Sequence, residues 1–299
     1  MKYVVTGGAG FIGSNLVNKL VKDNHKVYVI DNFSTGKKEN CNQKAVYYNY
    51  DISDEKNQII FQDIMQGSRA VFHLAALARV QPSILNPVKY EVNNSVGTVN
   101  ILKAASNAKV KKFIYSSSSS VYGDTTNLPS SEDDTLSPMS PYANQKYYGE
   151  LCCKMFSKIT NIETVCLRYF NVFGEGQNLD GAYATVVGIF LNLKNKRLPL
   201  TINGSGNQKR DFTYVGDVVD ANIRAASSNK IFKGDVFNVG SGSNISINEL
   251  ASLIGGKKIY NKAVDEPFAN LASIEKINKI LGWKPQTSIK SWLKDWSNH

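Results

Sequence analysis

A tyrosine and a lysine four residues apart are the first pair in this sequence whose types and spacing could do chemistry. Tyr142 and Lys146 stand in the segment SPYANQK, residues 140–146. Serine followed by proline is typical of a helix start, so we expect Ser140 at the N-cap and Pro141 at the first helical position. One helical turn then brings Tyr142 and Lys146 onto the same face. Because a nearby ammonium favours the phenolate, the pair predicts a tyrosine with a lowered pKa that acts as a general base.

A second group of residues has the spacing of a dinucleotide-binding loop. The segment TGGAGFIG, residues 6–13, lies between an apolar run and an amphipathic stretch. At such a strand–turn–helix junction, backbone N–H groups and the helix dipole bind phosphate, and side chains would keep the phosphate away. The glycines alone are also compatible with a turn that binds nothing. The loop residues that we predict to contact a cofactor are Gly7, Gly10, Phe11, Ile12 and Gly13.

Asp31 ends the next predicted strand, eighteen residues after Gly13. A carboxylate at this position accepts hydrogen bonds from a ribose diol and repels a 2′-phosphate, which favours NAD over NADP. We include the adjacent Asn32 among the predicted cofactor-binding residues. Asp51 and Ile52 are also included because they could meet the adenine ring, although the isolated pair is equally compatible with an ordinary loop.

The elements that must position these residues alternate between strand and helix. Apolar periodicity predicts a helix over residues 11–21. The expected fold is α/β, a doubly wound parallel (Rossmann) sheet in residues 1–170 with a smaller C-terminal α/β substrate domain in residues 171–299. Parts of residues 210–240, especially 236–240, are expected to extend the sheet. Runs that are apolar throughout predict strands at residues 3–5, 27–30, 70–74, 112–115 and 163–167.

Two helices are predicted in the second half of the chain. Ser246 and Glu249 have the spacing of a capping box, which predicts a helix that continues to Ile254. A second helix is expected over residues 273–281, with Gly282 at its C-terminal end.

Composition narrows the class of protein. The chain is 42% hydrophobic and 20% charged, and no run approaches the roughly twenty apolar residues of a membrane span. The net charge of +10 is spread over scattered lysines, so we expect an anionic small substrate and no nucleic-acid partner. Three unclustered histidines and four cysteines without ligand spacing indicate no metal site. Reduced thiols and the absence of a secretory segment before the first strand predict a cytoplasmic protein.

Three motifs together resemble those of the extended short-chain dehydrogenase/reductases. They are the glycine loop, the Tyr-x-x-x-Lys pair and SSSSVYG at residues 117–123. Within that family the sequence is most similar to the UDP-glucose (UDP-galactose) and UDP-N-acetylglucosamine 4-epimerases, over essentially the whole chain. The segments LRYFNVFG at residues 167–174 and RDFTYV at residues 210–215 also match substrate-domain signatures of these epimerases.

The resemblance implies roles for individual residues of the reactive site. By position, Ser118 resembles the catalytic serine, Tyr142 the base, and Lys146 the lysine that also holds the nicotinamide ribose. For His73, at the end of a predicted strand, a packing role and a catalytic role both stay open. Further residues resemble those that line the cofactor site of the family: Leu74, Ala75, Ala76, Asn93 and Tyr169.

The resemblance also implies a substrate site with two departures from the family pattern. Asn171 and Arg210 resemble ligands of the UDP diphosphate, and Asn270 lies where the family gates the 2-substituent of the sugar. Asparagine leaves more room there than tyrosine, so we expect N-acetylated sugars to be accepted. A second diphosphate arginine is missing, which leaves Lys262 or Arg79 as a replacement; a lysine there would act only as a point charge.

The implied reaction is NAD-dependent C4 epimerisation of UDP-hexoses through a transient 4-keto sugar. Ser119 and Ser120 stand where dehydratases carry Asp-Glu, and the glutamate typical of decarboxylases is missing as well. A UDP-glucuronate epimerase or another NAD-dependent nucleotide-sugar enzyme remains an alternative. A non-catalytic NAD-sensing or RNA-associated protein is a second one, although the intact Tyr142 and Lys146 argue against it. From the family we also expect a homodimer, formed through helices near residues 97–108 and 142–158.

Overall fold

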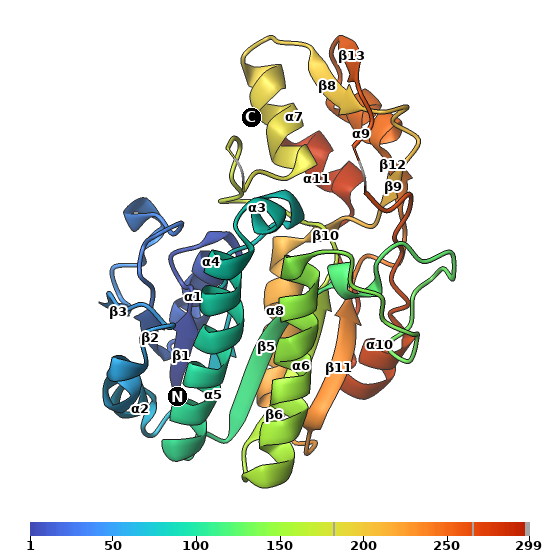
Figure 1. Cartoon of the computed structure of the whole chain (residues 1–299). Coiled ribbons are helices and arrows are strands. Elements are labelled where there is room, and N and C mark those ends of the chain that lie inside the picture. The colour runs from blue at the N-terminus through green and yellow to red at the C-terminus, as the bar shows by residue number, and fades with distance from the viewer. Residues whose placement is uncertain (182, 265, 297–299) are drawn as a thin grey trace.

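A seven-stranded parallel sheet forms the centre of the protein, with the strands in the order β11-β6-β5-β4-β1-β2-β3 (Figure 1). The computed structural model describes residues 1–181, 183–264 and 266–296; Ala182, Asp265 and residues 297–299, with His299 among them, lie outside the described residues. The sheet consists of β1 (Lys2–Thr6), β2 (Lys26–Ile30), β3 (Val46–Tyr48), β4 (Ala70–His73), β5 (Lys112–Ser118), β6 (Glu163–Tyr169) and β11 (Lys233–Val239). From β1 the chain adds β2 and β3 on one side and then crosses to β4 on the other side. The strand order therefore reverses between β1 and β4, and α/β proteins bind ligands at such a point.

Helices cover both faces of this sheet, which explains why its strands are apolar throughout. Tyr3 and Val5 of β1 pack into one core and Val4 into the other, because successive side chains of a strand point to opposite faces. The first core contains α1 (Phe11–Lys22), α8 (Val215–Ser227) and α10 (Glu275–Leu281). The second contains α2 (Gln58–Met65), α5 (Gly97–Asn107) and α6 (Pro141–Ile159). The predicted doubly wound sheet is confirmed.

The second half of the chain adds a smaller group of elements beyond the carboxyl ends of the strands (Figure 1). Its core includes Phe173, Phe190, Leu200 and Leu250. Its helices are α7 (Val186–Asn195), α9 (Ile247–Ile254) and α11 (Ile289–Trp296), and its short strands are β7 (Val172–Phe173), β8 (Leu200–Asn203), β9 (Lys209–Arg210), β10 (Thr213–Tyr214), β12 (Ile245–Ser246) and β13 (Lys258–Asn261). Single-turn elements complete the chain: η1 (Lys38–Asn40), η2 (Glu55–Asn57), α3 (Val80–Leu85), α4 (Pro87–Glu91), η3 (Val92–Val96) and η4 (Ser119–Tyr122).

Several local predictions are confirmed, and one boundary moves. β11 pairs in parallel with β6, so the segment near residues 236–240 does extend the sheet. Ser246 and Glu249 form the predicted capping box of α9. The helix α10 begins at Glu275 rather than at Ser273, because Ser273 donates its backbone N–H to the carbonyl of Ser130 and is held in an extended segment. Among the described residues, no helix has the length and apolar character needed to cross a membrane.

The glycine loop between β1 and α1 is packed so closely that side chains are excluded. Gly7 has φ +73°, and a Cβ there would lie 2.6 Å from the backbone nitrogen of Ala75. A Cβ on Gly13 would overlap the carbonyl oxygen of Gly7, a backbone atom that cannot rotate away. The loop therefore presents bare backbone at the carboxyl end of β1, which is the geometry that a phosphate needs.

We predict that Gly13→Ala destabilises the protein by about 1–3 kcal/mol, because the added methyl group must push the loop backbone apart. Chemical denaturation monitored by circular dichroism measures the free energy of unfolding. Gly10→Ala is the matched control, since its Cβ would lie 3.3 Å from the same Gly7 oxygen and should cost less. Equal stabilities of the two variants would contradict the packing argument.

Candidate active site

A narrow hollow opens at the carboxyl ends of β1, β2 and β4, where the sequence analysis expects the cofactor. Nine of its lining residues were predicted from the sequence: Gly7, Gly10, Asp31, Asn32, Ile52, Leu74, Ala75, Ala76 and Asn93. Six were missed: Ile30, Ser34, Thr35, Gly36, Tyr50 and Leu77. The polar, glycine-containing loop directly after Asp31 is the signal that could have found three of these six. Phe11, Ile12 and Gly13 lie behind this lining, at the start of α1.

The carboxylate of Asp31 joins this hollow to the glycine loop. Its Oδ2 accepts a hydrogen bond of 2.9 Å from the backbone of Ala9, and its Oδ1 accepts one of 2.8 Å from the backbone of Phe33. Backbone N–H groups thus hold both oxygens of the carboxylate in place, and Asp31 lines the hollow. A glycine cradle beside a fixed carboxylate fits the pyrophosphate and the ribose diol of NAD.

The sequence pattern left the roles of Asp51 and Ile52 open, and the structure gives their side chains different positions. Ile52 lines the hollow, whereas the carboxylate of Asp51 accepts hydrogen bonds from Asn32 (2.9 Å) and from the hydroxyl of Ser53 (2.6 Å). Burial alone would raise the pKa of Asp51, but the hydrogen bonds from Ser53 and Asn32 lower it below the usual value. Asp51 therefore orients Asn32 and the loop backbone at this end of the hollow.

The predicted reactive residues come together where β5 ends and α6 begins. Ser140 caps α6 by accepting a hydrogen bond of 3.1 Å from the backbone of Ala143, as predicted. Tyr142 follows in the first turn, close enough to Ser118, the last residue of β5, for the serine hydroxyl to act on the pKa of the phenol. The Nζ of Lys146 lies 5.8 Å from the centre of the Tyr142 ring and donates to the carbonyl of Ser116 at 2.9 Å.

The prediction that Lys146 lowers the pKa of Tyr142 is wrong for this structure. Burial raises the pKa of Tyr142, and the Ser118 hydroxyl and the charge of Arg79 only partly oppose that effect. The ammonium of Lys146 is directed to a backbone carbonyl instead, and burial lowers its own pKa to about 8. The cation that acts on the phenol is thus Arg79, which the sequence analysis had considered only as a diphosphate ligand.

Arg79 is held in an unusual position beside this site. Its backbone has φ +85°, a conformation that L residues rarely adopt, and its guanidinium donates twice to the carbonyl of Tyr183, at 3.1 and 2.9 Å. Burial lowers its pKa, while the phenols of Tyr142 and Tyr90 raise it. Strained backbone of this kind concentrates at functional sites, where the surrounding structure maintains it.

His73 is a buried link between the cofactor hollow and α5, and its tautomer follows from its partners. Thr98 donates its hydroxyl hydrogen to the carbonyl of Asn94 (2.6 Å), so it accepts from Nε2 of His73 (3.0 Å). Because the ring hydrogen is then on Nε2, Nδ1 of His73 accepts a hydrogen bond from the hydroxyl of Thr6 (2.8 Å). The same hydroxyl accepts the backbone N–H of Ala75. Burial and, less strongly, Lys146 lower the pKa of His73 to about 3. Of the two open roles, the structure favours packing and positioning.

The π-helical turn η3 points the side chains of two adjacent asparagines in different directions. Asn93 lines the hollow, whereas Asn94 points inward. Asn94 bonds both backbone groups of Leu77 (2.8 and 3.0 Å) and the side chain of Gln145 (3.0 Å), next to Lys146. An extra residue in a helical turn often marks a functional position, and here it directs one amide to the hollow and the other to α6.

A buried ion pair lies beneath the serine motif. Arg168 of β6 forms two hydrogen bonds with the carboxylate of Glu150, at 2.9 and 2.7 Å, and a third with the phenol of Tyr122 at 2.9 Å. Ser117 donates to the same Glu150 carboxylate. The pair was not predicted, because nothing in the local sequence distinguishes these two charges from surface ones.

The predicted substrate ligands gather beside β9. Asn171 donates to the side-chain oxygen of Asn270 at 3.1 Å, and that oxygen also accepts the backbone N–H of Asp211 at 2.8 Å. Arg210 lies next to Asp211 and pairs with Glu266 at 2.8 Å. Asn171, Arg210 and Asn270 are therefore neighbours in space.

Three of the remaining predicted residues lie apart from these ligands. The hydroxyl of Tyr169 is buried and bonds to Ser116 and Asn222, so this side chain belongs to the sheet core. Lys262 is exposed just after β13. The guanidinium of Arg79 bonds the carbonyl of Tyr183 and acts on Tyr142, at the reactive end of the site.

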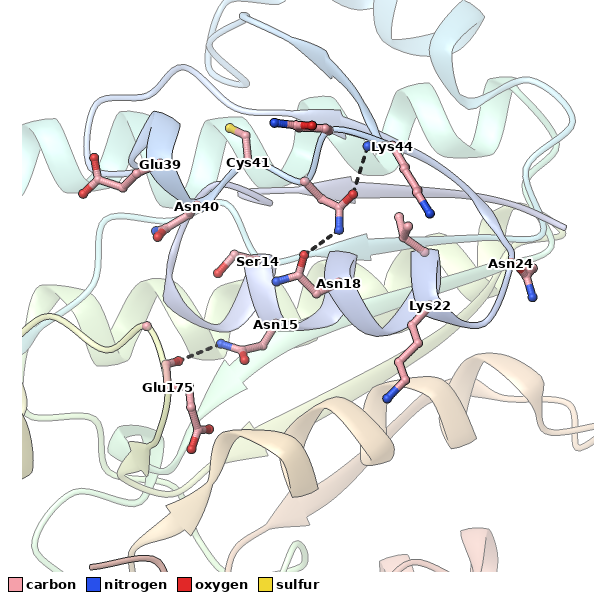
Figure 2. Close-up of a pocket in the computed structure, with 14 residues that line it drawn as sticks. Ser14, Asn15, Asn18, Lys22, Asn24, Glu39, Asn40, Cys41, Lys44 and Glu175 are labelled. Atoms are coloured by element: carbon pink, nitrogen blue, oxygen red, sulfur yellow. Dashed lines mark hydrogen bonds between the residues drawn. The ribbon is translucent and has the colours of Figure 1, made fainter. Parts of the chain in front are cut away.

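A larger hollow of about 850 Å³ lies along α1 and the loop after β2 (Figure 2). Amide side chains dominate it: Asn42 bonds Asn18 at 2.8 Å, and Asn15 bonds the carbonyl of Glu175 at 2.9 Å. None of the residues predicted to react or to bind a ligand lines it. The narrower hollow at the strand ends is therefore the candidate site.

We predict that the buried His73 weakens folding in acid. Its pKa of about 3 lies below the value of about 6.5 expected in the unfolded chain, which therefore binds one more proton between those pH values. The free energy of unfolding should fall by about 1 kcal/mol per pH unit from this residue as the pH drops below 6. His73→Asn should remove that part of the slope in denaturation curves measured between pH 5 and 6.

The control is His25→Asn, which changes a half-buried histidine near the N-terminus whose pKa is also lowered by burial and by the N-terminal charge, without the full burial of His73. It should change the slope less than His73→Asn does. If His73→Asn and His25→Asn had the same slope, the buried neutral state of His73 would be refuted.

Comparisons with known proteins show the family of this chain. The model of the NAD dependent epimerase/dehydratase family matches residues 3–240. A UDP-glucose 4-epimerase from Thermotoga maritima, solved with UDP-glucose, is 35% identical, with a TM-score of 0.93 over 98% of this chain and 96% of its own. A UDP-N-acetylglucosamine 4-epimerase from Methanobrevibacter ruminantium, in complex with UDP-N-acetylmuramic acid, is 36% identical, with a TM-score of 0.89 over 99% and 98%.

A third relative acts on a uronate. The UDP-glucuronic acid 4-epimerase from Bacillus cereus, solved with UDP-glucuronic acid and NAD, is 34% identical, with a TM-score of 0.88 over 98% of this chain and 97% of its own. Both the sequence match and the shared fold extend over nearly the whole chain. The chain therefore belongs to the NAD dependent epimerase/dehydratase family, as an NAD-dependent isomerase of the UDP-glucose 4-epimerase type.

Proposed function

We propose that this protein interconverts UDP-glucose with UDP-galactose and UDP-N-acetylglucosamine with UDP-N-acetylgalactosamine, through a transient 4-keto sugar. The observation that carries this proposal is that Ser118, Tyr142 and Lys146 come together at the sheet edge that also holds the cofactor hollow. The motif after Ser118 continues with two serines, which provide no carboxylate for eliminating water. An alcohol oxidised at this site would thus be reduced again rather than dehydrated.

In this proposal Tyr142 takes the proton of the C4 hydroxyl, and Ser118 holds the same hydroxyl by a hydrogen bond. NAD held by the glycine loop and Asp31 would supply the hydride acceptor and donor for C4, and the proton on Tyr142 would return to the C4 oxygen when the keto group is reduced. The guanidinium of Arg79 favours the phenolate form of Tyr142, because an opposite charge nearby stabilises the ionised state. Lys146, fixed by the carbonyl of Ser116, is the proposed ligand of the nicotinamide ribose.

We propose that residues 1–170, with α8 and β11, bind NAD and that most of residues 171–299 binds the UDP-sugar. The separate core of α7, α9 and α11 supports this division. Asn171 and Arg210 are the proposed diphosphate ligands, and Asn270 faces the 2-substituent of the sugar. The proposed NAD contacts are Gly7, Gly10, Phe11, Ile12, Gly13, Asp31, Asn32, Asp51, Ile52, Leu74, Ala75, Ala76, Asn93, Tyr142 and Lys146. Tyr169, whose hydroxyl bonds Ser116 and Asn222 in the sheet core, is not among them.

One observation favours a second candidate substrate, UDP-glucuronate. Arg79 lies close enough to Tyr142 to act on its pKa, and its guanidinium donates to the backbone carbonyl of Tyr183. Among the described residues no carboxylate forms an ion pair with it; a partly buried guanidinium without a counter-ion is costly, and the carboxylate of a uronate would supply one. Testing this sugar beside the two neutral ones separates the candidates.

We predict that the purified protein converts UDP-glucose and UDP-N-acetylglucosamine into their galacto epimers without added reductant, as followed by proton NMR. Tyr142→Phe should lower both rates at least about a hundredfold, because the general base is lost while the ring remains. Tyr148→Phe is the matched control, since Tyr148 lies on the exposed side of the same helix. Turnover of UDP-glucuronate alone would support the second candidate, and no turnover of any of the three by NAD-loaded protein would refute the proposed function.

We also propose that the protein is a homodimer formed through α5 and α6, which lie side by side (Figure 1). An apolar stripe runs along the exposed side of α6 at helical spacing: Tyr148, Leu151, Met155 and Ile159, each 44–69% exposed. Val92 and Val96, just before α5, are exposed as well. A continuous apolar face of this kind is typical of a surface that a second subunit covers.

Sedimentation equilibrium should give twice the 33.0 kDa mass of one chain. Leu151→Glu should shift the protein to a monomer, because the new charge would be buried in the subunit interface. The control Leu198→Glu changes a similarly exposed leucine outside α5 and α6 and should leave the dimer intact. A monomeric unmodified protein at micromolar concentration would rule out this interface.

A further inference from the structure

We infer that Glu266 competes with the substrate diphosphate for Arg210 and thereby sets the affinity of the protein for UDP-sugars. This inference rests on the proposed function, in which Arg210 is a diphosphate ligand. Glu266 lies in the stretch where the sequence analysis noted that a second diphosphate arginine is missing. The chain thus carries a negative charge in a region where the resemblance implies a positive one.

Both carboxylate oxygens of Glu266 have partners, one in Arg210 and the other in Gln208. Oε2 lies 2.8 Å from Nη2 of Arg210, and Oε1 accepts a hydrogen bond of 3.2 Å from the side chain of Gln208. The side chain of Arg210 is only 10% exposed, whereas that of Glu266 is 37% exposed. The arginine is therefore a fixed partner, and the glutamate is the member of the pair that can turn toward solvent.

The second amino group of the Arg210 guanidinium, Nη1, already has hydrogen-bond partners. Nη1 of Arg210 donates to the carbonyl of Lys209 at 2.9 Å and to the carbonyl of Phe268 at 3.3 Å. These bonds hold the guanidinium plane and leave the Nη2 edge for an anion, where the carboxylate now lies. A guanidinium binds carboxylate and phosphate oxygens with the same planar geometry, so the two anions compete for the same N–H groups.

Binding of a diphosphate to the Nη2 edge has a definite electrostatic consequence. If the Glu266 carboxylate stayed in place, two anions would share one cation at contact distance, and their repulsion would weaken binding. If it turned away, the ion pair with Arg210 and the hydrogen bond from Gln208 would be lost. In either case part of the attraction between Arg210 and the diphosphate is offset by Glu266.

The backbone around Glu266 keeps this competitor close to Arg210. Phe268 donates its N–H to the carboxylate of Asp124 at 3.2 Å, and its carbonyl accepts the N–H of Lys209 at 2.9 Å. Asn270 donates its backbone N–H to the carbonyl of Lys209 as well, at 3.2 Å. The segment is thus attached to β9 and to the loop after the serine motif, so displacement of Glu266 requires only a change of its side-chain rotamer.

The test measures UDP binding to the NAD-loaded protein by isothermal titration calorimetry. Glu266→Gln keeps the shape of the side chain and removes its charge, and it should tighten UDP binding about fivefold at low salt, with a smaller gain at high ionic strength. Arg210→Gln should weaken binding at least about tenfold. In the Arg210→Gln background, the additional change Glu266→Gln should have no effect, because the cation for which the two anions compete is gone.

Asp220→Asn is the matched control, because Asp220 pairs with Arg224 at 2.6 Å on the surface of α8 and its loss changes the net charge equally. It should leave UDP affinity unchanged. Unchanged or weaker UDP binding by Glu266→Gln, with Arg210→Gln still impaired, would overturn the competition and leave the proposed function intact. If Arg210→Gln bound UDP as well as the unmodified protein, the proposed diphosphate role of Arg210 would fail instead.

Discussion

The buried ion pair of Glu150 and Arg168 is the interaction on which the reactive end of the molecule depends. It joins α6 to β6, and through Ser117 it also holds the end of β5. Removing one partner of such a pair leaves an uncompensated buried charge, which is far more destabilising than loss of a surface pair. Because Tyr142, Lys146 and Glu150 follow one another at four-residue intervals on α6, the ion pair also fixes the depth at which the two reactive side chains meet Ser118.

The cofactor hollow is connected to this end by polar groups rather than by packing alone. His73 receives a hydrogen bond from Thr6 and gives one to Thr98, and the next residue pair along the path is Asn94 and Gln145. Gln145 is the neighbour of Lys146 on α6. In the low-dielectric interior such a fully paired chain is rigid, since each broken bond leaves an unsatisfied buried group. The glycine loop and the reactive tyrosine are thus held in one frame.

Positive charge is distributed along the site in two places with different surroundings. Arg79 lies by Tyr142 and bonds a backbone carbonyl, so its charge acts on the phenol. Arg210 is paired with Glu266, so its charge is partly neutralised before a diphosphate arrives. In the proposed function, the same residue type would serve proton chemistry at one point and adjustable anion binding at the other, according to its nearest partner.

The sequence by itself determined the doubly wound sheet, the glycine loop, the cap at Ser140 and the spacing of Tyr142 and Lys146. These features depend on short-range rules: apolar periodicity, bare backbone at a tight turn, and 3.6 residues per helical turn. It also led to Asn171, Arg210 and Asn270, which the structure brings together beside β9. Nine of the residues that line the cofactor hollow were also predicted from the sequence.

Only the tertiary structure decided which charges act on which groups. Lys146 was expected to lower the pKa of Tyr142, yet it bonds the carbonyl of Ser116, and Arg79 from a distant segment takes that role. Glu150 pairs with Arg168, and Arg210 with Glu266, across 18 and 56 residues of chain. The pKa of a group depends on its burial and on neighbours within a few ångströms, and neither is encoded in local spacing, because folding brings these partners together from separate elements.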